Sequence, residues 1–169
     1  MILANILAFP IMLVMTSLQM VVFSRILINS GSGDLILLTL CVWAIGEQGE
    51  TAFFWGLVGG LLIGFISATP LVVVLGSYIL VVFSARLFHR WLWQAPILAT
   101  MLSVVAGTIG KSIIEMIGLQ ATGIHLNFLE GLGSIIAPSL LLNFLLLFPM
   151  YILINDLAQW MAPKEIYEQ

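Results

Sequence analysis

Long apolar stretches separated by short polar ones make up most of this chain. Several of them approach or exceed the ~18 apolar residues that mark a membrane-spanning helix. Backbone groups in hydrocarbon must pair within their own segment, and the stretches lack the alternation of membrane β-strands, so they predict helices. The pattern predicts six segments, at approximately residues 2–23, 34–46, 51–68, 70–88, 95–118 and 132–155.

The second segment is the least certain to cross a bilayer. At ~1.5 Å per residue, residues 34–46 form a helix ~20 Å long, shorter than the ~30 Å hydrocarbon core. Six spans are therefore the main prediction, and five spans with the second or third segment re-entrant are the alternative. The first segment is expected to bend or loosen near Pro10.

Composition narrows the class further. Charged residues make up 8% of the chain and hydrophobic residues 62%, whereas a soluble domain carries about 25% charged residues. Too little polar surface exists to cover a water-facing globule. The sequence thus predicts an all-α, polytopic transmembrane bundle that forms one domain over residues 1–169. Its single cysteine excludes an internal disulfide framework.

The few basic residues suggest an orientation. If both termini lie in the cytoplasm and six segments cross, the inner side holds Arg86, Arg90 and Lys164, and the outer side holds only Arg25. This bias agrees with the excess of Lys and Arg on the cytoplasmic side of membrane proteins.

Small residues recur every four positions along the third segment, at Ala52, Gly56, Gly60, Gly64 and Ala68. Residues at this spacing share one helix face, and small side chains there let two helix backbones approach closely in lipid. This face could dock a helix of a partner protein, or it could pack against helices of the same chain. The sequence leaves both alternatives open.

Two opposite charges lie inside the fifth segment. Lys111 and Glu115 are four residues apart and so share a helix face. A charge at mid-membrane costs about 2.5–3.5 kcal/mol on insertion scales, and pairing lowers that cost. We expect an intramembrane ion pair, with Lys111 reaching toward the interface; a polar contact to a partner or ligand is the alternative.

Asp34 follows a Gly-Ser-Gly sequence and precedes an apolar run, which predicts that its carboxylate caps a helix start. His89 and His125 lack neighbours at metal-ligand spacing. Neither a nucleophile elbow nor a phosphate-binding glycine loop is present. The sequence therefore predicts no catalytic residues, no metal site and no cofactor.

Three stretches resemble the MreD family of rod shape-determining membrane proteins. Residues 34–44 resemble the second segment of that family, and residues 56–71 resemble its glycine-rich helix with a Ser-x-x-Pro-Leu ending. Residues 138–151 resemble its last span. The chain departs from the family at Gly33, where Pro is common, at Gly64, where Asp is common, and at Val72, where Gly is common.

The resemblance implies a non-enzymatic subunit of the bacterial cell-elongation complex in the cytoplasmic membrane. Its implied partners are MreC, RodA with its transpeptidase and, indirectly, the MreB filament. The partner-binding residues proposed on this basis are Gly56, Gly60 and Gly64, with Arg25 and Asp34 near the outer surface.

The family is also similar in fold to the substrate-binding subunits of energy-coupling-factor vitamin transporters, which supplies the alternative function. Such a subunit needs a pocket with a few polar groups among apolar walls. Lys111, Glu115, His125 and Asn127 could line one near the outer face.

Overall fold

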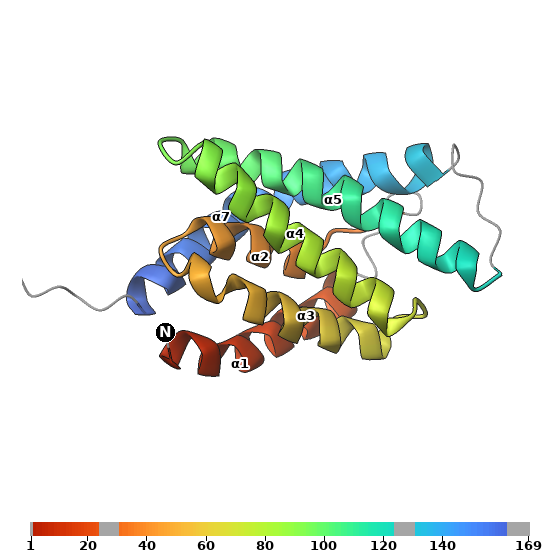
Figure 1. Ribbon diagram of the computed structural model, residues 1–169, viewed down its shortest axis with the longest axis horizontal. Helices are drawn as coiled ribbons and strands as arrows, with labels where there is room; N and C mark the ends of the chain where they lie inside the picture. Colours follow the sequence, from red (N-terminus) through yellow and green to blue (C-terminus); the bar gives the residue numbers. More distant parts are fainter. Residues whose placement is uncertain (1, 24–30, 124–130, 162–169) are drawn as a thin grey trace, which may run out of the picture.

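A computed structural model of the chain describes residues 2–23, 31–123 and 131–161. All regular elements within these ranges are helices (Figure 1). They are α1 (Ile2–Leu18), the π-helical turn η1 (Gln19–Phe23), α2 (Leu35–Ile45), the 3₁₀ turn η2 (Gly49–Thr51), α3 (Ala52–Ile66), α4 (Leu71–Trp91), α5 (Pro96–Ala121), the π-helical turn η3 (Leu132–Ile136) and α7 (Ala137–Met161).

The predicted all-α transmembrane bundle is confirmed. The described residues contain five helices that are long and apolar enough to cross a membrane, and one shorter apolar helix, α2. Successive helices run in opposite directions, so the start of α1 and the end of α7 lie at the same end of the bundle (Figure 1). Pro10 lies inside α1 without ending it, and the helix widens into a π-helical turn only after Leu18.

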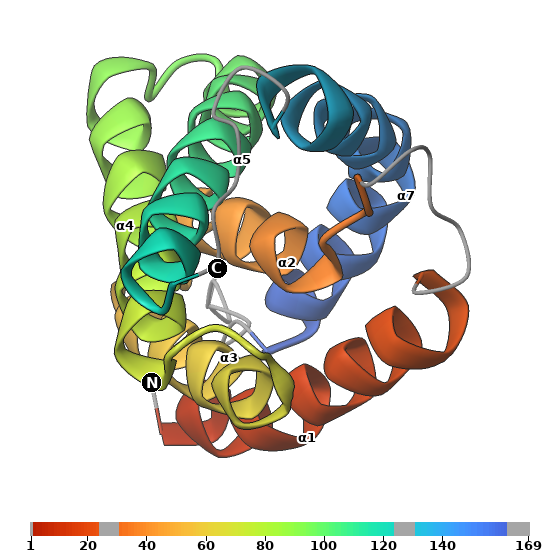
Figure 2. The ribbon, with the colours of Figure 1, turned by 90° about the vertical axis from the view of Figure 1, so that its right-hand side faces the viewer.

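The short helix α2 lies at the centre of the bundle. Its 11 residues span about 16 Å at the helical rise. It contacts α1, α3, α4, α5 and α7, which surround it as Figure 2 shows. All of its residues are buried, as expected for a helix that is apolar on every face.

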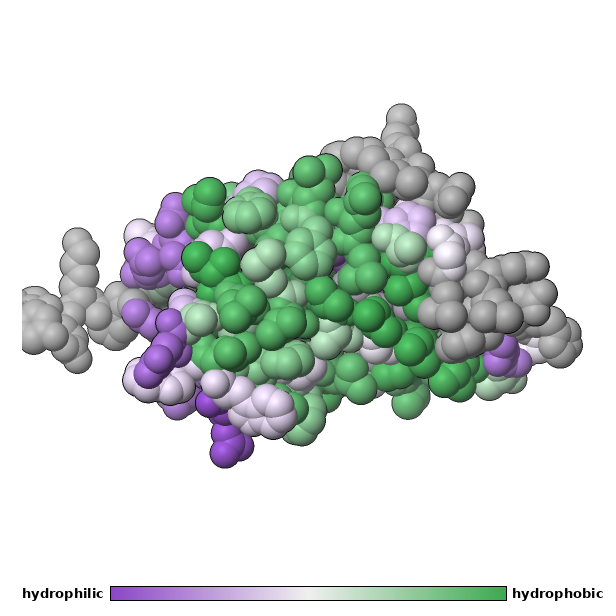
Figure 3. Space-filling view, turned by 90° about the horizontal axis from the view of Figure 1, so that it is seen from above, coloured by the Kyte–Doolittle hydropathy of each residue, from purple (hydrophilic) through white to green (hydrophobic). Residues whose placement is uncertain are grey.

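Neighbouring helices of the surrounding ring pack in the order α1, α3, α4, α5 and α7. Helices α7 and α1 close the ring less tightly than the other neighbouring pairs. An apolar groove lined by side chains of both helices lies between them. Large apolar side chains cover the outside of the ring, and Figure 3 shows the resulting hydrophobic belt with polar residues gathered at one end. This surface matches a helix bundle in lipid, so the chain is a multi-pass membrane protein.

Two stacked tryptophans connect the C-terminal end of α2 to α3. The rings of Trp43 and Trp55 lie 3.8 Å apart between centroids and are nearly parallel. Trp43 Nε1 donates to Thr51 Oγ1 at 2.9 Å, and Trp55 Nε1 donates to the Ala4 carbonyl at 3.1 Å. Both buried indole N–H groups are therefore paired.

Candidate functional site

Asp34 is placed by the start of α2, as its sequence context predicts. One carboxylate oxygen accepts from the backbone N–H of Leu37 at 2.9 Å, which is the N-cap bond. The backbone N–H of Asp34 donates to Asn143 Oδ1 of α7 at 2.8 Å. The cap residue is thus held by its own helix and by a second one.

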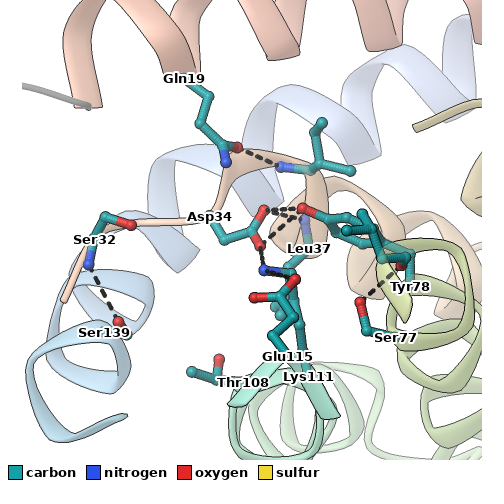
Figure 4. Close-up of polar contacts among 12 residues, drawn as sticks. Gln19, Ser32, Asp34, Leu37, Ser77, Tyr78, Thr108, Lys111, Glu115 and Ser139 are labelled. Carbon is teal, nitrogen blue, oxygen red and sulfur yellow. Dashed lines mark hydrogen bonds and ion pairs between the residues drawn. The ribbon is translucent and has the colours of Figure 1, made fainter. Parts of the chain in front are cut away.

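Lys111 of α5 forms ion pairs with two carboxylates (Figure 4). Its Nζ lies 3.1 Å from Asp34 Oδ2 and 2.9 Å from Glu115 Oε1. The side chains of Lys111, Asp34 and Glu115 are 16%, 10% and 25% exposed. Lys111 therefore pairs with Glu115, as the sequence predicts, and also with an aspartate 77 positions earlier in the chain. Because this group lies inside a helix bundle that crosses lipid, pairing offsets much of the cost of its charges.

Tyr78 adds α4 to the group. Its hydroxyl donates to Asp34 at 3.1 Å from Oδ2, and the Lys111 ammonium lies 5.1 Å from the centre of its ring. The second distance is within the range of a cation–π interaction. We call Asp34, Tyr78, Lys111 and Glu115 the charged cluster.

Asn143 connects the charged cluster to α5 and α7. While its Oδ1 accepts from Asp34, its Nδ2 donates to Thr108 Oγ1 at 2.9 Å. Asn143 is almost fully buried, so both hydrogen bonds form away from lipid. The start of α2 is consequently tied to α4, α5 and α7 by side-chain contacts.

The residues before α2 lie against the start of α7. The backbone N–H of Ser32 donates to Ser139 Oγ at 3.2 Å. A Cβ atom on Gly31 would lie only 2.7 Å from the Ile135 carbonyl oxygen and 2.8 Å from Pro138 Cβ, so this approach requires glycine. Ser139 and Asn143 are one helical turn apart and hold successive parts of the segment.

Gln19 completes the hydrogen bonding at the start of α2. Its Oε1 accepts from the backbone N–H groups of Leu35 at 3.0 Å and Ile36 at 3.4 Å. Since Asp34 accepts from Leu37, the first three N–H groups of α2 are all paired with side chains.

A polar cavity of about 110 Å³ lies beside the charged cluster. It is lined by Gln19, Ser32, Asp34, Leu37, Thr108, Lys111, Ser112, Glu115, Ile135, Ser139 and Asn143. These residues come from η1, the first turn of α2 with the residues before it, the second half of α5, η3 and the start of α7. The cavity therefore lies toward the end of the bundle where α1 and α5 finish and α7 begins.

The opposite end of α2 is held by Arg86 of α4. Its Nη1 donates to the Ala44 carbonyl at 3.1 Å. Gly49 makes room for this contact, because a Cβ atom there would collide with Arg86 Nη1 and lie 2.5 Å from the Ala44 oxygen. A positive charge at a helix C-terminus also suits the helix dipole.

The glycine face of α3 packs inside the chain. A Cβ atom on Gly56 would lie 3.0 Å from Val82 Cγ2, one on Gly60 would lie 3.0 Å from Leu75 Cδ2, and one on Gly64 would collide with Leu71. All three neighbours belong to α4. The structure thus uses this face as the internal alternative describes, and a partner could reach it only if α4 moved aside.

The other predicted site residues divide between described and undescribed parts of the chain. Asp34 is buried in the charged cluster, and it lines the polar cavity together with Lys111 and Glu115. Arg25, His125 and Asn127 lie outside the described residues. Sequence reasoning missed Tyr78, Asn143, Thr108 and Gln19. Their polar side chains inside apolar segments could have indicated them, because hydrogen-bonding side chains in such segments usually face the protein interior.

Within the described ranges, no group of three or more His, Cys, Asp or Glu side chains is placed to hold a metal ion. Comparisons of the chain with protein-family models, with curated proteins and with solved structures found no match.

Proposed function

We propose that this protein is a non-enzymatic scaffold of the bacterial cell-elongation complex, similar to MreD, that binds MreC and helps to organise peptidoglycan synthesis. RodA with its transpeptidase, and indirectly the MreB filament, are the further partners. The proposal places the chain in the bacterial cytoplasmic membrane with both termini on the inner side. That orientation is supported by Arg86 and Arg90, which belong to the last turns of α4 at the same end as the start of α1.

One observation carries the proposal: the axis of the bundle is occupied by α2. All its residues are buried, and the polar cavity beside it measures only about 110 Å³. Pockets for small molecules usually measure about 300–1,000 Å³. A filled interior favours a protein that acts through its surface over one that encloses a vitamin-sized ligand.

The three stretches that resemble MreD all contribute to this packing. Residues 34–44 contribute the cap and most of α2, residues 56–66 pack on α4, and Asn143 of α7 receives the backbone of Asp34. Each of these stretches therefore contains residues that join helices, which is the property a rigid scaffold requires.

The runner-up is a substrate-binding subunit of an energy-coupling-factor transporter. The polar cavity favours it, because Lys111 and Glu115 lie in its wall as that alternative expects. The small volume of the cavity, about 110 Å³, counts against such a subunit. The larger groove between α1 and α7, of about 460 Å³, is lined only by apolar side chains and Pro10, so it lacks the polar groups that fix a vitamin.

Photocrosslinking in native membranes tests the proposal. Benzoylphenylalanine would replace one lipid-facing residue at a time, at Val14 of α1, Phe65 of α3, Val72 of α4 or Leu145 of α7, all strongly exposed. We expect adducts with MreC from one side of the ring and none from the opposite side. The silent positions serve as internal controls for random capture.

Two outcomes would contradict the scaffold. Adducts with the membrane and ATPase subunits of a transporter would support the runner-up. An absence of protein adducts at all four positions, with each variant present in the membrane at wild-type level, would remove partner binding through the lipid-facing surface. Mass spectrometry of the purified protein would show in the same preparation whether a small molecule accompanies it.

A further inference from the structure

The polar cavity has unused hydrogen-bonding capacity. Glu115 is paired through Oε1 alone, and the Ser112 hydroxyl and the Gln19 side-chain N–H₂ have no partner among the described residues. A polar cavity of about 110 Å³ is large enough for a few water molecules, each of which occupies ≈ 30 Å³ in the liquid. The space can thus take one small polar group but no vitamin-sized ligand.

The formal charge of the lining favours a cation. Asp34 and Glu115 carry two negative charges and Lys111 one positive charge, which leaves a net charge of −1. An uncompensated charge among membrane-spanning helices is costly, so a positive group entering the cavity would be stabilised. Anions lack their usual binding site, because Gln19 and Asp34 already use the first three N–H groups of α2.

A metal ion fits the cavity poorly. The Lys111 ammonium lies within about 3 Å of both carboxylates, at 3.1 and 2.9 Å, and holds the position that a metal would need. The groups left to accept hydrogen bonds are one carboxylate oxygen and hydroxyls, because the oxygens of Gln19 and Asn143 already accept from backbone N–H groups. Such acceptors suit a cation that donates hydrogen bonds.

We propose that the polar cavity binds a single ammonium or guanidinium group, received by the free oxygen of Glu115 and the hydroxyl of Ser112. That group belongs either to a Lys or Arg side chain of a partner protein or to a small free amine. The proposal does not depend on which protein is the partner, so it stands apart from the assignment to the elongation complex.

Cysteine modification tests the charge preference. Ser112→Cys places a thiol of similar size in the cavity wall, and the native Cys41 is fully buried. The purified chain would be treated with 2-aminoethyl methanethiosulfonate, an ammonium, and with 2-sulfonatoethyl methanethiosulfonate, an anion. Rates would be normalised to those of a free thiol, and Glu50→Cys, at the opposite end of the bundle, is the control.

We expect the normalised rate of the Ser112→Cys variant to favour the ammonium reagent by at least about tenfold, or about 1.4 kcal/mol. Adding Glu115→Gln should remove most of that preference, while Glu50→Gln should leave it. Equal rates for the two reagents, or a preference that survives Glu115→Gln, would overturn the proposal.

The unfolding midpoint of the unlabelled protein gives an independent readout. Ethylammonium chloride should raise the midpoint of the wild type, and tetramethylammonium chloride, which has charge but no N–H group, should not. The same rise with both salts at equal ionic strength would contradict the proposed hydrogen bonds. If Glu115→Gln is too unstable to purify, Ser112→Ala takes its place. It removes a hydroxyl that has no partner among the described residues, and it should reduce the rise in the midpoint.

The source of the group follows from comparing environments. If a partner side chain fills the cavity, the thiol introduced by Ser112→Cys should react more slowly in native membranes than in the purified chain. If a small amine fills it, the two rates should agree once the membranes are washed, and added ethylammonium should slow both.

Discussion

Asp34 and Arg86 hold opposite ends of the same buried helix. The Asp34 carboxylate caps the first turn of α2, and the Arg86 guanidinium donates to the Ala44 carbonyl in its last turn. Each charge has the sign that the helix dipole favours at its end. An 11-residue helix too short to cross the membrane is thereby fixed at both ends by side chains, one from its own cap and one from α4.

Removing Lys111 should be the most damaging change in the charged cluster. Lys111→Met leaves Asp34 and Glu115 as two mostly buried carboxylates without their shared cation, which costs about 3 kcal/mol for a broken buried pair. Asp34→Asn retains a capping side chain and leaves Lys111 paired with Glu115, so it should cost about 1 kcal/mol. The measurement is the free energy of unfolding in detergent.

The double variant separates this explanation from simple loss of packing. Asp34→Asn in the Lys111→Met background restores the original net charge of −1, so the pair of changes should be less destabilising than Lys111→Met alone. Additive costs would show that the two side chains do not interact. Glu50→Gln, which changes an exposed acid distant from the cluster, is the control and should be neutral.

Gly49 should tolerate no side chain while Arg86 caps α2. In Gly49→Ala the new methyl group would displace the guanidinium from the Ala44 carbonyl. Loss of a hydrogen bond to a charged group predicts a destabilisation of about 1.5–3 kcal/mol, measured by thermal unfolding. Gly46→Ala is the matched control, because its Cβ atom would lie at an ordinary 3.5 Å from its nearest neighbour. Equal effects of the two substitutions would contradict the assigned role of Gly49.

The glycines of α3 and α4 should respond differently to the same substitution. Gly60→Leu must push α3 away from Leu75 and Tyr78 of α4, and overpacking of this kind costs about 1–3 kcal/mol. Gly76→Leu adds a side chain where no atom lies within 4 Å, on an exposed face of α4. It should leave the unfolding midpoint unchanged or raise it, because leucine favours helix more than glycine does.

The Gly60→Leu variant also tests partner binding by the glycine face. If Gly60→Leu lowers co-purification with MreC only as far as it lowers the amount of folded protein, the glycines serve internal packing. A loss of MreC with unchanged unfolding midpoint would instead support the docking groove proposed from the sequence.

The sequence contains most of the information about the helices and little about their contacts. Apolar run length predicted all six segments, and their ends differ from the observed helices by a few residues because interfacial residues extend α4, α5 and α7. Proximity of Lys111 to Glu115 follows from helix periodicity. Proximity of Lys111 to Asp34 does not, because no periodic pattern relates residues on different helices of a bundle.

The role of α2 illustrates the same limit. Its length alone suggested a partial crossing, but length does not say that the helix is buried on every face or which helices surround it. The four-residue spacing of glycines likewise predicted close helix packing without identifying α4 as the neighbour.

Burial of α2 predicts that the only cysteine of the chain is chemically silent. Cys41 lies in the middle of α2 and is fully buried, so N-ethylmaleimide should label it very slowly in native membranes. Denaturation in sodium dodecyl sulfate should make labelling complete, as measured by the mass of the intact protein. A Glu47→Cys, Cys41→Ser variant carries its thiol on an exposed turn and should react rapidly in both conditions. Rapid labelling of Cys41 in native membranes would mean that the centre of the bundle opens to water, and the packed axis on which the scaffold proposal rests would then be wrong.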